Sequence, residues 1–136
     1  MRLALDTNVI SELAKPECHP NVQAWIVDLD SLDLFLPAPC WAELKRGLFL
    51  LPHGRRRDAL TTRLDALVGG LGGVLPFAKR EAEVYAEVTS QAGRPRPTID
   101  AMIAAICRAN DLALATRNIR DFSDCGIRLV DPWIAG

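Results

Sequence analysis

The chain lacks the features that mark a membrane protein, a disulfide scaffold or a protein that binds nucleic acid by bulk charge. No apolar run in its 136 residues approaches the ~18 that a membrane span needs, and an acid at position 6 precedes any signal-peptide core. Its four cysteines include no C-x-x-C pair, so we expect free thiols and a reducing cytoplasm. A net charge of −1 argues against RNA or DNA binding through positive charge alone.

Aromatic residues are also scarce, at 6% of the chain. No stacking platform for single-stranded bases is evident from their positions. The three tryptophans, Trp25, Trp41 and Trp133, lie in apolar segments. We expect them in the core or at an interface.

Short apolar segments alternate with helix-like segments along the chain. We expect strands at residues 2–5, 32–38, 74–77, 112–116 and 127–130. We expect helices at residues 8–14, 20–29, 39–51, 54–67, 78–92 and 98–111. This alternation predicts one α/β domain over residues 1–136, with a mainly parallel sheet and helices on both faces. Ligands of such sheets bind at the carboxyl ends of the strands.

Three acids lie beyond predicted strand ends or in early helical turns: Asp6, Glu43 and Asp100. Because parallel strands end at one edge of a sheet, these side chains should meet there. Each acid also has a simpler interpretation. Asp6 could cap the next helix, and Asp100 could be a first-turn charge. Glu43 could pair with Arg46 on the surface.

Neighbouring carboxylates repel one another unless a cation neutralises them. Oxygen ligands suit Mg²⁺ or Mn²⁺ rather than zinc. Such an ion lowers the pKa of bound water and binds phosphoryl oxygens, and nearby helix N-termini are expected to keep Asp6 ionised. The residues therefore predict metal-assisted hydrolysis of a phosphate ester.

Four segments, in this order, resemble PIN-domain ribonucleases, and within them the VapC/FitB-like toxins of bacterial toxin–antitoxin pairs. They read LALDTNVISEL, WAELKRGLFLLPHGRRR, IDAMIAAICRANDLALATRN and VDPW. The likeness runs over nearly the whole chain. It implies a three-layer α/β/α PIN domain with a five-stranded parallel sheet in the order 3-2-1-4-5. It also implies a divalent-metal-dependent endoribonuclease that cleaves single-stranded regions of RNA.

By position, the resemblance makes Asp6, Glu43 and Asp100 catalytic acids and ligands of Mg²⁺ or Mn²⁺. The residues that match the family's supporting polar positions are Thr7, Asn8, Thr116 and Asn118. Asn118 departs from the pattern, because family members often have Asp there. Asp121 could supply the missing catalytic carboxylate. This departure weakens the case for a second tightly held metal and leaves the first site in place.

The resemblance also implies partners. A homodimer is expected, together with a cognate antitoxin whose C-terminal segment lies along a groove on the toxin. That segment often directs a basic side chain at the carboxylates. Such pairs commonly bind their own promoter DNA through the antitoxin.

Arginine accounts for 13 of the 16 basic residues, and its planar group matches phosphate geometry. Four arginines flank the predicted site and are candidates for binding RNA: Arg94, Arg96, Arg117 and Arg120. Each could instead be a solvated surface charge.

Two other protein classes fit the sequence poorly, and one alternative remains. A haloacid-dehalogenase-type phosphohydrolase needs a second acid two residues after Asp6, where this chain has Asn8. A receiver domain needs an acidic pair at the end of the first strand, which is absent. A catalytically inactive PIN-fold binding module is the remaining alternative. Asn118 favours it, and the three retained acids argue against it.

Overall fold

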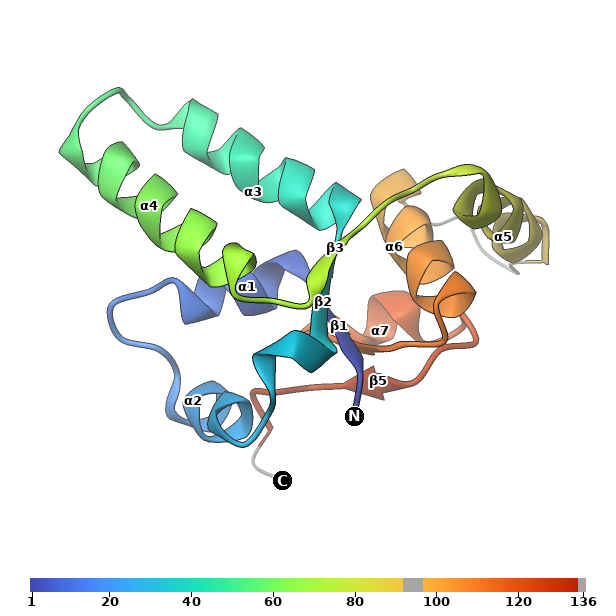
Figure 1. Ribbon diagram of the computed structural model, residues 1–136. Helices are drawn as coiled ribbons and strands as arrows, with labels where there is room; N and C mark the ends of the chain where they lie inside the picture. Colours follow the sequence, from blue (N-terminus) through green and yellow to red (C-terminus); the bar gives the residue numbers. More distant parts are fainter. Residues whose placement is uncertain (92–96, 135–136) are drawn as a thin grey trace.

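Five short strands form one parallel sheet, as expected. The computed structural model describes residues 1–91 and 97–134. The strands are β1 (Leu3–Leu5), β2 (Leu34–Pro37), β3 (Gly73–Leu75), β4 (Ala113–Ala115) and β5 (Leu129–Val130). Their order is β3-β2-β1-β4-β5, and every neighbouring pair is parallel (Figure 1). The order that the resemblance implied is confirmed.

Helices connect the strands and flank the sheet. They are α1 (Thr7–Leu13), α2 (Pro20–Val27), α3 (Ala38–Leu50), α4 (Arg55–Gly69), α5 (Lys79–Gln91), α6 (Thr98–Ala109) and α7 (Ile119–Phe122). A 3-10 turn, η1 (Ser31–Asp33), occupies the start of the strand predicted at 32–38. The sequence did not predict α7, because four residues are too few to show a helical period.

The central strands are buried throughout, which explains why they read as unbroken apolar runs. All three residues of β1 and all three of β4 are buried. Ile103 and Ile106 on α6 and Phe122 on α7 are buried with them. Burial on both faces is what helices on a parallel sheet produce.

The register of β1 and β4 positions the polar residues that follow them. Leu5 pairs with Ala115, and the backbone N–H of Asp6 donates to the carbonyl of Ala115 at 2.9 Å. The next residue along each strand is Asp6 on one side and Thr116 on the other. The two polar side chains therefore leave the sheet side by side at its carboxyl edge.

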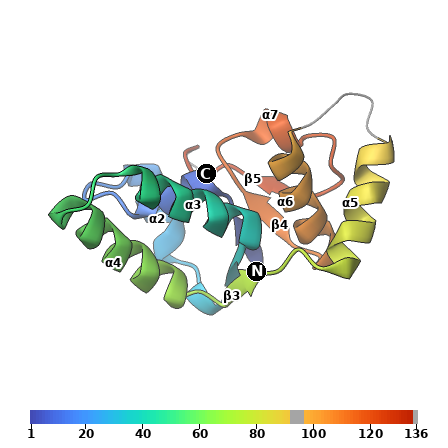
Figure 2. The ribbon, with the colours of Figure 1, turned by 90° about the horizontal axis from the view of Figure 1, so that it is seen from above.

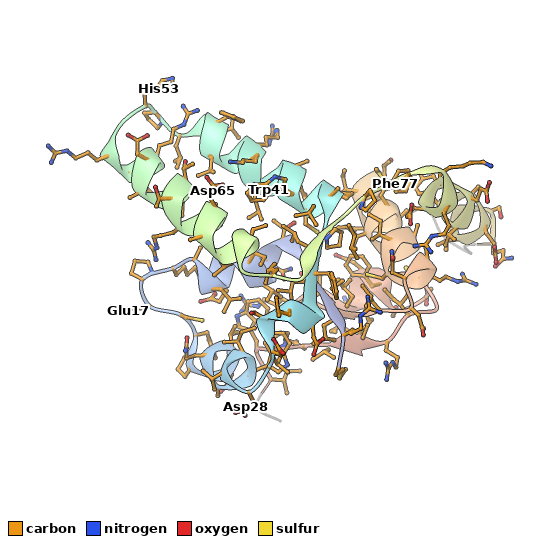
Figure 3. The ribbon with its side chains drawn as sticks, in the orientation of Figure 1. Glu17, Asp28, Trp41, His53, Asp65 and Phe77 are labelled. Carbon is orange, nitrogen blue, oxygen red and sulfur yellow. The ribbon has the colours of Figure 1, made fainter. Side chains whose placement is uncertain are left out.

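Two helix pairs lie at opposite ends of the molecule. Figures 1 and 2 show α3 running alongside α4 at one end, and α5 alongside α6 at the other. Figure 3 places His53 at the turn between α3 and α4, with Trp41 and Asp65 further along the two helices. One helix of each pair, α3 and α6, contributes a residue to the hollow that Asp6 lines, Glu43 and Asp100 respectively.

Two further findings bear on the expectations above. In the part of the chain that the structure describes, no helix is long and apolar enough to span a membrane. The four cysteines are thiols outside any disulfide, as predicted, and Cys40, Cys107 and Cys125 are buried while Cys18 is partly buried.

Candidate active site

A cleft of about 450 Å³ opens at the carboxyl edge of the sheet. Four carboxylates line it: Asp6, Glu12, Glu43 and Asp100. The other lining residues are Thr7, Asn8, Ser11, Lys15, Arg117, Asn118 and Trp133. The three acids predicted from the sequence therefore face the same hollow, although they are up to 94 positions apart.

Asp6 is firmly held at the cleft, and only 6% of its surface is exposed. Its Oδ1 accepts from the backbone N–H of Thr7 at 2.8 Å and from the Cys40 thiol at 3.8 Å. Its Oδ2 accepts from the Thr116 hydroxyl at 2.7 Å and from the Asn8 amide at 3.4 Å. The capping interpretation of Asp6 is thus correct, since it is the N-cap of α1. The same carboxylate also faces the cleft.

Burial raises the pKa of Asp6, because removal from water disfavours the charged carboxylate. The Thr116 hydroxyl and the Thr7 N–H act in the opposite direction, and the nearby charge of Glu43 raises the pKa further. The net shift is upward. The Thr7 N–H at the start of α1 does favour the ionised form, as expected, but desolvation of the buried carboxylate outweighs it.

Glu43 is tied to Asp6 through a single residue. The Thr7 hydroxyl donates to Oε1 of Glu43 at 2.7 Å, while the Thr7 backbone N–H donates to Asp6. The alternative pairing with Arg46 is not formed in the described structure. Glu43 is exposed, so it faces solvent from the cleft wall.

The other predicted residues divide between the cleft and its surroundings. Asp100, in the first turn of α6, is half-buried and lines the cleft. Asn118 lines it too, and its N–H donates to the Thr116 hydroxyl at 3.0 Å. Asp121 and Arg120 are exposed on α7 and are not among the lining residues. A catalytic role for Asp121 therefore stays a prediction.

Of the four candidate arginines, Arg117 lines the cleft. Arg94 and Arg96 fall outside the described residues. RNA contact by any of the four arginines therefore stays a prediction.

Two lining residues on α1, Ser11 and Glu12, were missed by sequence reasoning. Glu12 is buried, and its oxygens accept from Lys15 Nζ and from the His19 backbone N–H, both at 3.0 Å. These two donors, the His19 N–H first, lower the pKa of Glu12. The spacing from Asn8 to Glu12, one helical turn, could have placed Glu12 on the Asn8 face of α1.

Cys40 and Trp133 were also missed. Cys40 precedes Glu43 by three residues on α3, a spacing that places both on one face of the helix. Burial raises the pKa of the Cys40 thiol, so it remains a proton donor to Asp6. Trp133 was assigned to the core or an interface from its apolar neighbours, and the structure places it half-buried at the cleft.

The donor set of the cleft suits a hard cation. Asp6, Glu43 and Asp100 present carboxylate oxygens, the ligands that Mg²⁺ and Mn²⁺ prefer. Among the described residues, no three carboxylate, imidazole or thiol groups are close enough to hold one ion together. An ion here would keep water in part of its coordination sphere, as Mg²⁺ commonly does.

Comparisons with known proteins agree with this geometry. Residues 3–127 match the PIN domain family. The chain belongs to the PIN-domain family. It is 35% identical to Toxin FitB of Neisseria gonorrhoeae over 96% of this chain and 98% of that protein. It is 39% identical to the VapC ribonuclease Y4jK of Sinorhizobium fredii over 96% of this chain and 97% of the relative.

Solved structures show the same fold. The structure of FitAB bound to an IR36 DNA fragment superposes on this PIN domain with a TM-score of 0.88 and 32% identity. The match covers 98% of this chain and 97% of the other. The protein is thus homologous to VapC/FitB toxins over nearly its full length.

A second, larger hollow of this PIN domain adjoins the cleft. It is a groove of about 660 Å³ between α1, α3 and α4. Its walls are mostly apolar, with Leu44, Leu48, Leu60 and Leu64 among the lining residues. The groove and the cleft share four residues: Thr7, Ser11, Lys15 and Glu43. Whatever occupies the groove therefore lies beside the carboxylates.

The raised pKa of Asp6 predicts how stability depends on pH without metal. A protonated Asp6 favours the folded chain below its ordinary pKa of 3.8, and this contribution is lost as the pH rises through the raised pKa. Relative to Asp6→Asn, the wild type should therefore gain unfolding free energy as the pH falls from neutral toward about 4. Urea unfolding of both proteins in EDTA measures this difference.

Thr89→Val is the control, since it removes an exposed hydroxyl on α5 and no ionisable group. Its difference from the wild type should not change with pH. If the difference in unfolding free energy between the wild type and Asp6→Asn were also independent of pH, the pKa of Asp6 would not be raised by desolvation.

Proposed function

We propose that this protein is the toxin of a type II toxin–antitoxin pair, acting in the cytoplasm as a Mg²⁺- or Mn²⁺-dependent endoribonuclease on single-stranded regions of RNA. The observation that carries the proposal is the meeting of Asp6, Glu43 and Asp100 in one cleft beside Arg117. The names of the relatives, a FitB toxin and a VapC ribonuclease, support it.

Asp6, Glu43 and Asp100 would hold the ion, some of them directly and the others through metal-bound water. When bound, it supplies a water of lowered pKa and charge that stabilises the phosphoryl oxygens. Asp6 accepts from one thiol and from three nitrogen or oxygen donors. Among those three, the Asn8 amide is the most distant, at 3.4 Å, and its hydrogen bond is the weakest. Oδ2 of Asp6 can therefore exchange that contact for a cation while keeping its bond to Thr116.

The chain's own residues set the geometry of this site. Thr116 and the Thr7 N–H fix Asp6, and the Thr7 hydroxyl fixes Glu43 relative to it. Asn118, bonded through its N–H to Thr116, stands where the family often has an acid. It can hydrogen-bond a metal-bound water without adding charge. This neutral position is the one observation that favours an inactive binding module instead.

The apolar groove supports the antitoxin part of the proposal. Its apolar walls suit the apolar face of a helical or extended segment from a partner protein. Lys15, Arg56 and Arg63 also line the groove and would attract acidic residues beside that apolar face. Since the groove shares Lys15 and Glu43 with the cleft, a bound segment can also reach the carboxylates.

Two further partners belong to the proposal. A homodimer is expected for the toxin, and the complex with antitoxin is expected to bind promoter DNA. Related solved structures include a DNA-bound FitAB complex, which supports such an assembly.

The purified chain should cleave single-stranded RNA with Mg²⁺ or Mn²⁺, and EDTA should stop it. Asp6→Asn should lower the cleavage rate roughly a hundredfold or more while leaving the chain folded, because a neutral amide cannot hold the ion. Cleavage of a labelled single-stranded RNA, with circular dichroism as a folding check, measures both effects.

The matched control is Asp28→Asn, the same change at an exposed residue beyond the cleft (Figure 3). It should cleave like the wild type. If folded Asp6→Asn cleaves at the wild-type rate, the proposed site is wrong. If the wild type cleaves no RNA, the inactive binding module is favoured.

Asn118→Asp tests the neutral position. An added carboxylate at the cleft should tighten Mn²⁺ binding several-fold if a ligand position is open there. Calorimetric titration of Mn²⁺ into both proteins measures the difference. Unchanged affinity would show that position 118 does not contact the ion and would direct attention to Asp121.

A further inference from the structure

Arg117 and Trp133 form a cation–π pair at the cleft. The Cζ atom of Arg117 lies 5.1 Å from the centroid of the Trp133 ring, within the range of a cation–π contact. Both residues line the cleft that holds Asp6, Glu43 and Asp100. The C-terminal segment thus supplies an aromatic surface beside the carboxylates.

The charge of Arg117 is not neutralised within the described structure. Its side chain is exposed, and no ion pair joins it to a carboxylate among the residues described. Its backbone N–H donates to Oδ1 of Asn8 at 3.3 Å, which fixes its Cα beside the residues that flank Asp6. An unpaired cation beside several carboxylates would be drawn to them unless another contact held it. The Trp133 ring provides that contact.

Trp133 is itself fixed from both sides. Its backbone N–H donates to the Asp131 side chain at 2.9 Å, and its carbonyl accepts from the Asn21 side chain at 2.6 Å. Asn21 lies in the first turn of α2, so the C-terminal segment is tied to a distant part of the chain. The ring also packs against the hydrophobic core. A side chain held in this way is a rigid support for Arg117.

We propose that Trp133 is a positioning residue that holds the Arg117 guanidinium at the cleft rim, where it binds a phosphate of single-stranded RNA next to the cleaved bond. A cation–π contact holds the guanidinium through its charge, while its N–H groups can bind phosphate oxygens. The inference rests on the proposed ribonuclease function and adds to it a specific backbone contact.

Steady-state cleavage of a labelled single-stranded RNA tests the pair. Arg117→Ala and Trp133→Ala should each raise KM roughly tenfold with kcat nearly retained, because a charge-assisted hydrogen bond to substrate is lost. Trp133→Phe, which keeps an aromatic face, should restore most of the affinity. The KM of the double variant should be no higher than that of either single variant, because each substitution removes the same contact with RNA.

The salt dependence of binding separates this role from a structural one. In an Asp6→Asn background, where RNA stays uncut, the slope of log Kd against log salt should fall by about 0.7 for Arg117→Ala and also for Trp133→Ala. Trp133→Phe should keep the full slope. Phe49→Ala is the matched control, since it removes the aromatic partner of Arg57 outside the cleft and should change neither KM nor slope.

The outcomes are distinct. Suppose that the wild type cleaves RNA but Arg117→Ala, or folded Trp133→Ala, has an unchanged KM and salt slope. That result overturns the inference and leaves the proposed function standing. If Trp133→Ala does not fold, Trp133→Phe and Arg117→Lys decide it, and the lysine should raise KM because it lacks the planar fork. A folded wild type that neither cleaves nor binds RNA overturns both.

Discussion

The buried carboxylate of Asp6 is the constraint on which the rest of the site depends. Asp6 is only 6% exposed at the carboxyl edge of the sheet, and a buried carboxylate needs hydrogen-bond donors around it or a cation beside it. The chain provides donors from three separate segments: Thr7 and Asn8 on α1, Cys40 on α3 and Thr116 after β4. Hydrogen bonds from these donors connect the three segments at the cleft. Despite them, the pKa of the carboxylate is raised. The balance leaves Asp6 fixed in place and favoured to accept a cation.

The same arrangement would link the proposed catalysis to the proposed partner binding. Thr7 donates to both Asp6 and Glu43, and it also lines the apolar groove between α1, α3 and α4. Glu43 and Lys15 likewise belong to both hollows. A protein segment seated in the groove would therefore lie against residues that the proposed metal site needs. On this account one binding surface can both hold a partner and block the cleft.

Much of the fold was accessible from the sequence because both faces of the sheet are covered. Complete burial makes β1 and β4 continuous apolar runs, and each run is followed by a polar residue that marks its end, Asp6 and Thr116. The strand order came from the resemblance to a family, because periodicity does not reveal which strands are neighbours. The short helix α7 was missed, since four residues show no period.

The positions of the three acids in the candidate site could be predicted from the sequence, but most of the residues around them could not. Asp6, Glu43 and Asp100 could be placed because each follows a strand or begins a helix at the carboxyl edge. Trp133 and Cys40 could not, because their roles depend on long-range contacts with Arg117 and Asp6. The sign of the Asp6 pKa shift was also inaccessible, since the sequence does not show how far burial outweighs hydrogen bonding.

Anomalous diffraction from crystals soaked in Mn²⁺ tests the central claim most directly. The account predicts a manganese peak within ~2.3 Å of an Asp6 oxygen, with Glu43 and Asp100 bound to the ion directly or through water. The Thr116 hydroxyl should still donate to Asp6 in that crystal. Manganese ordered elsewhere, with Asp6 bonded only to its protein donors, would show that Asp6 is a structural cap and would contradict the account.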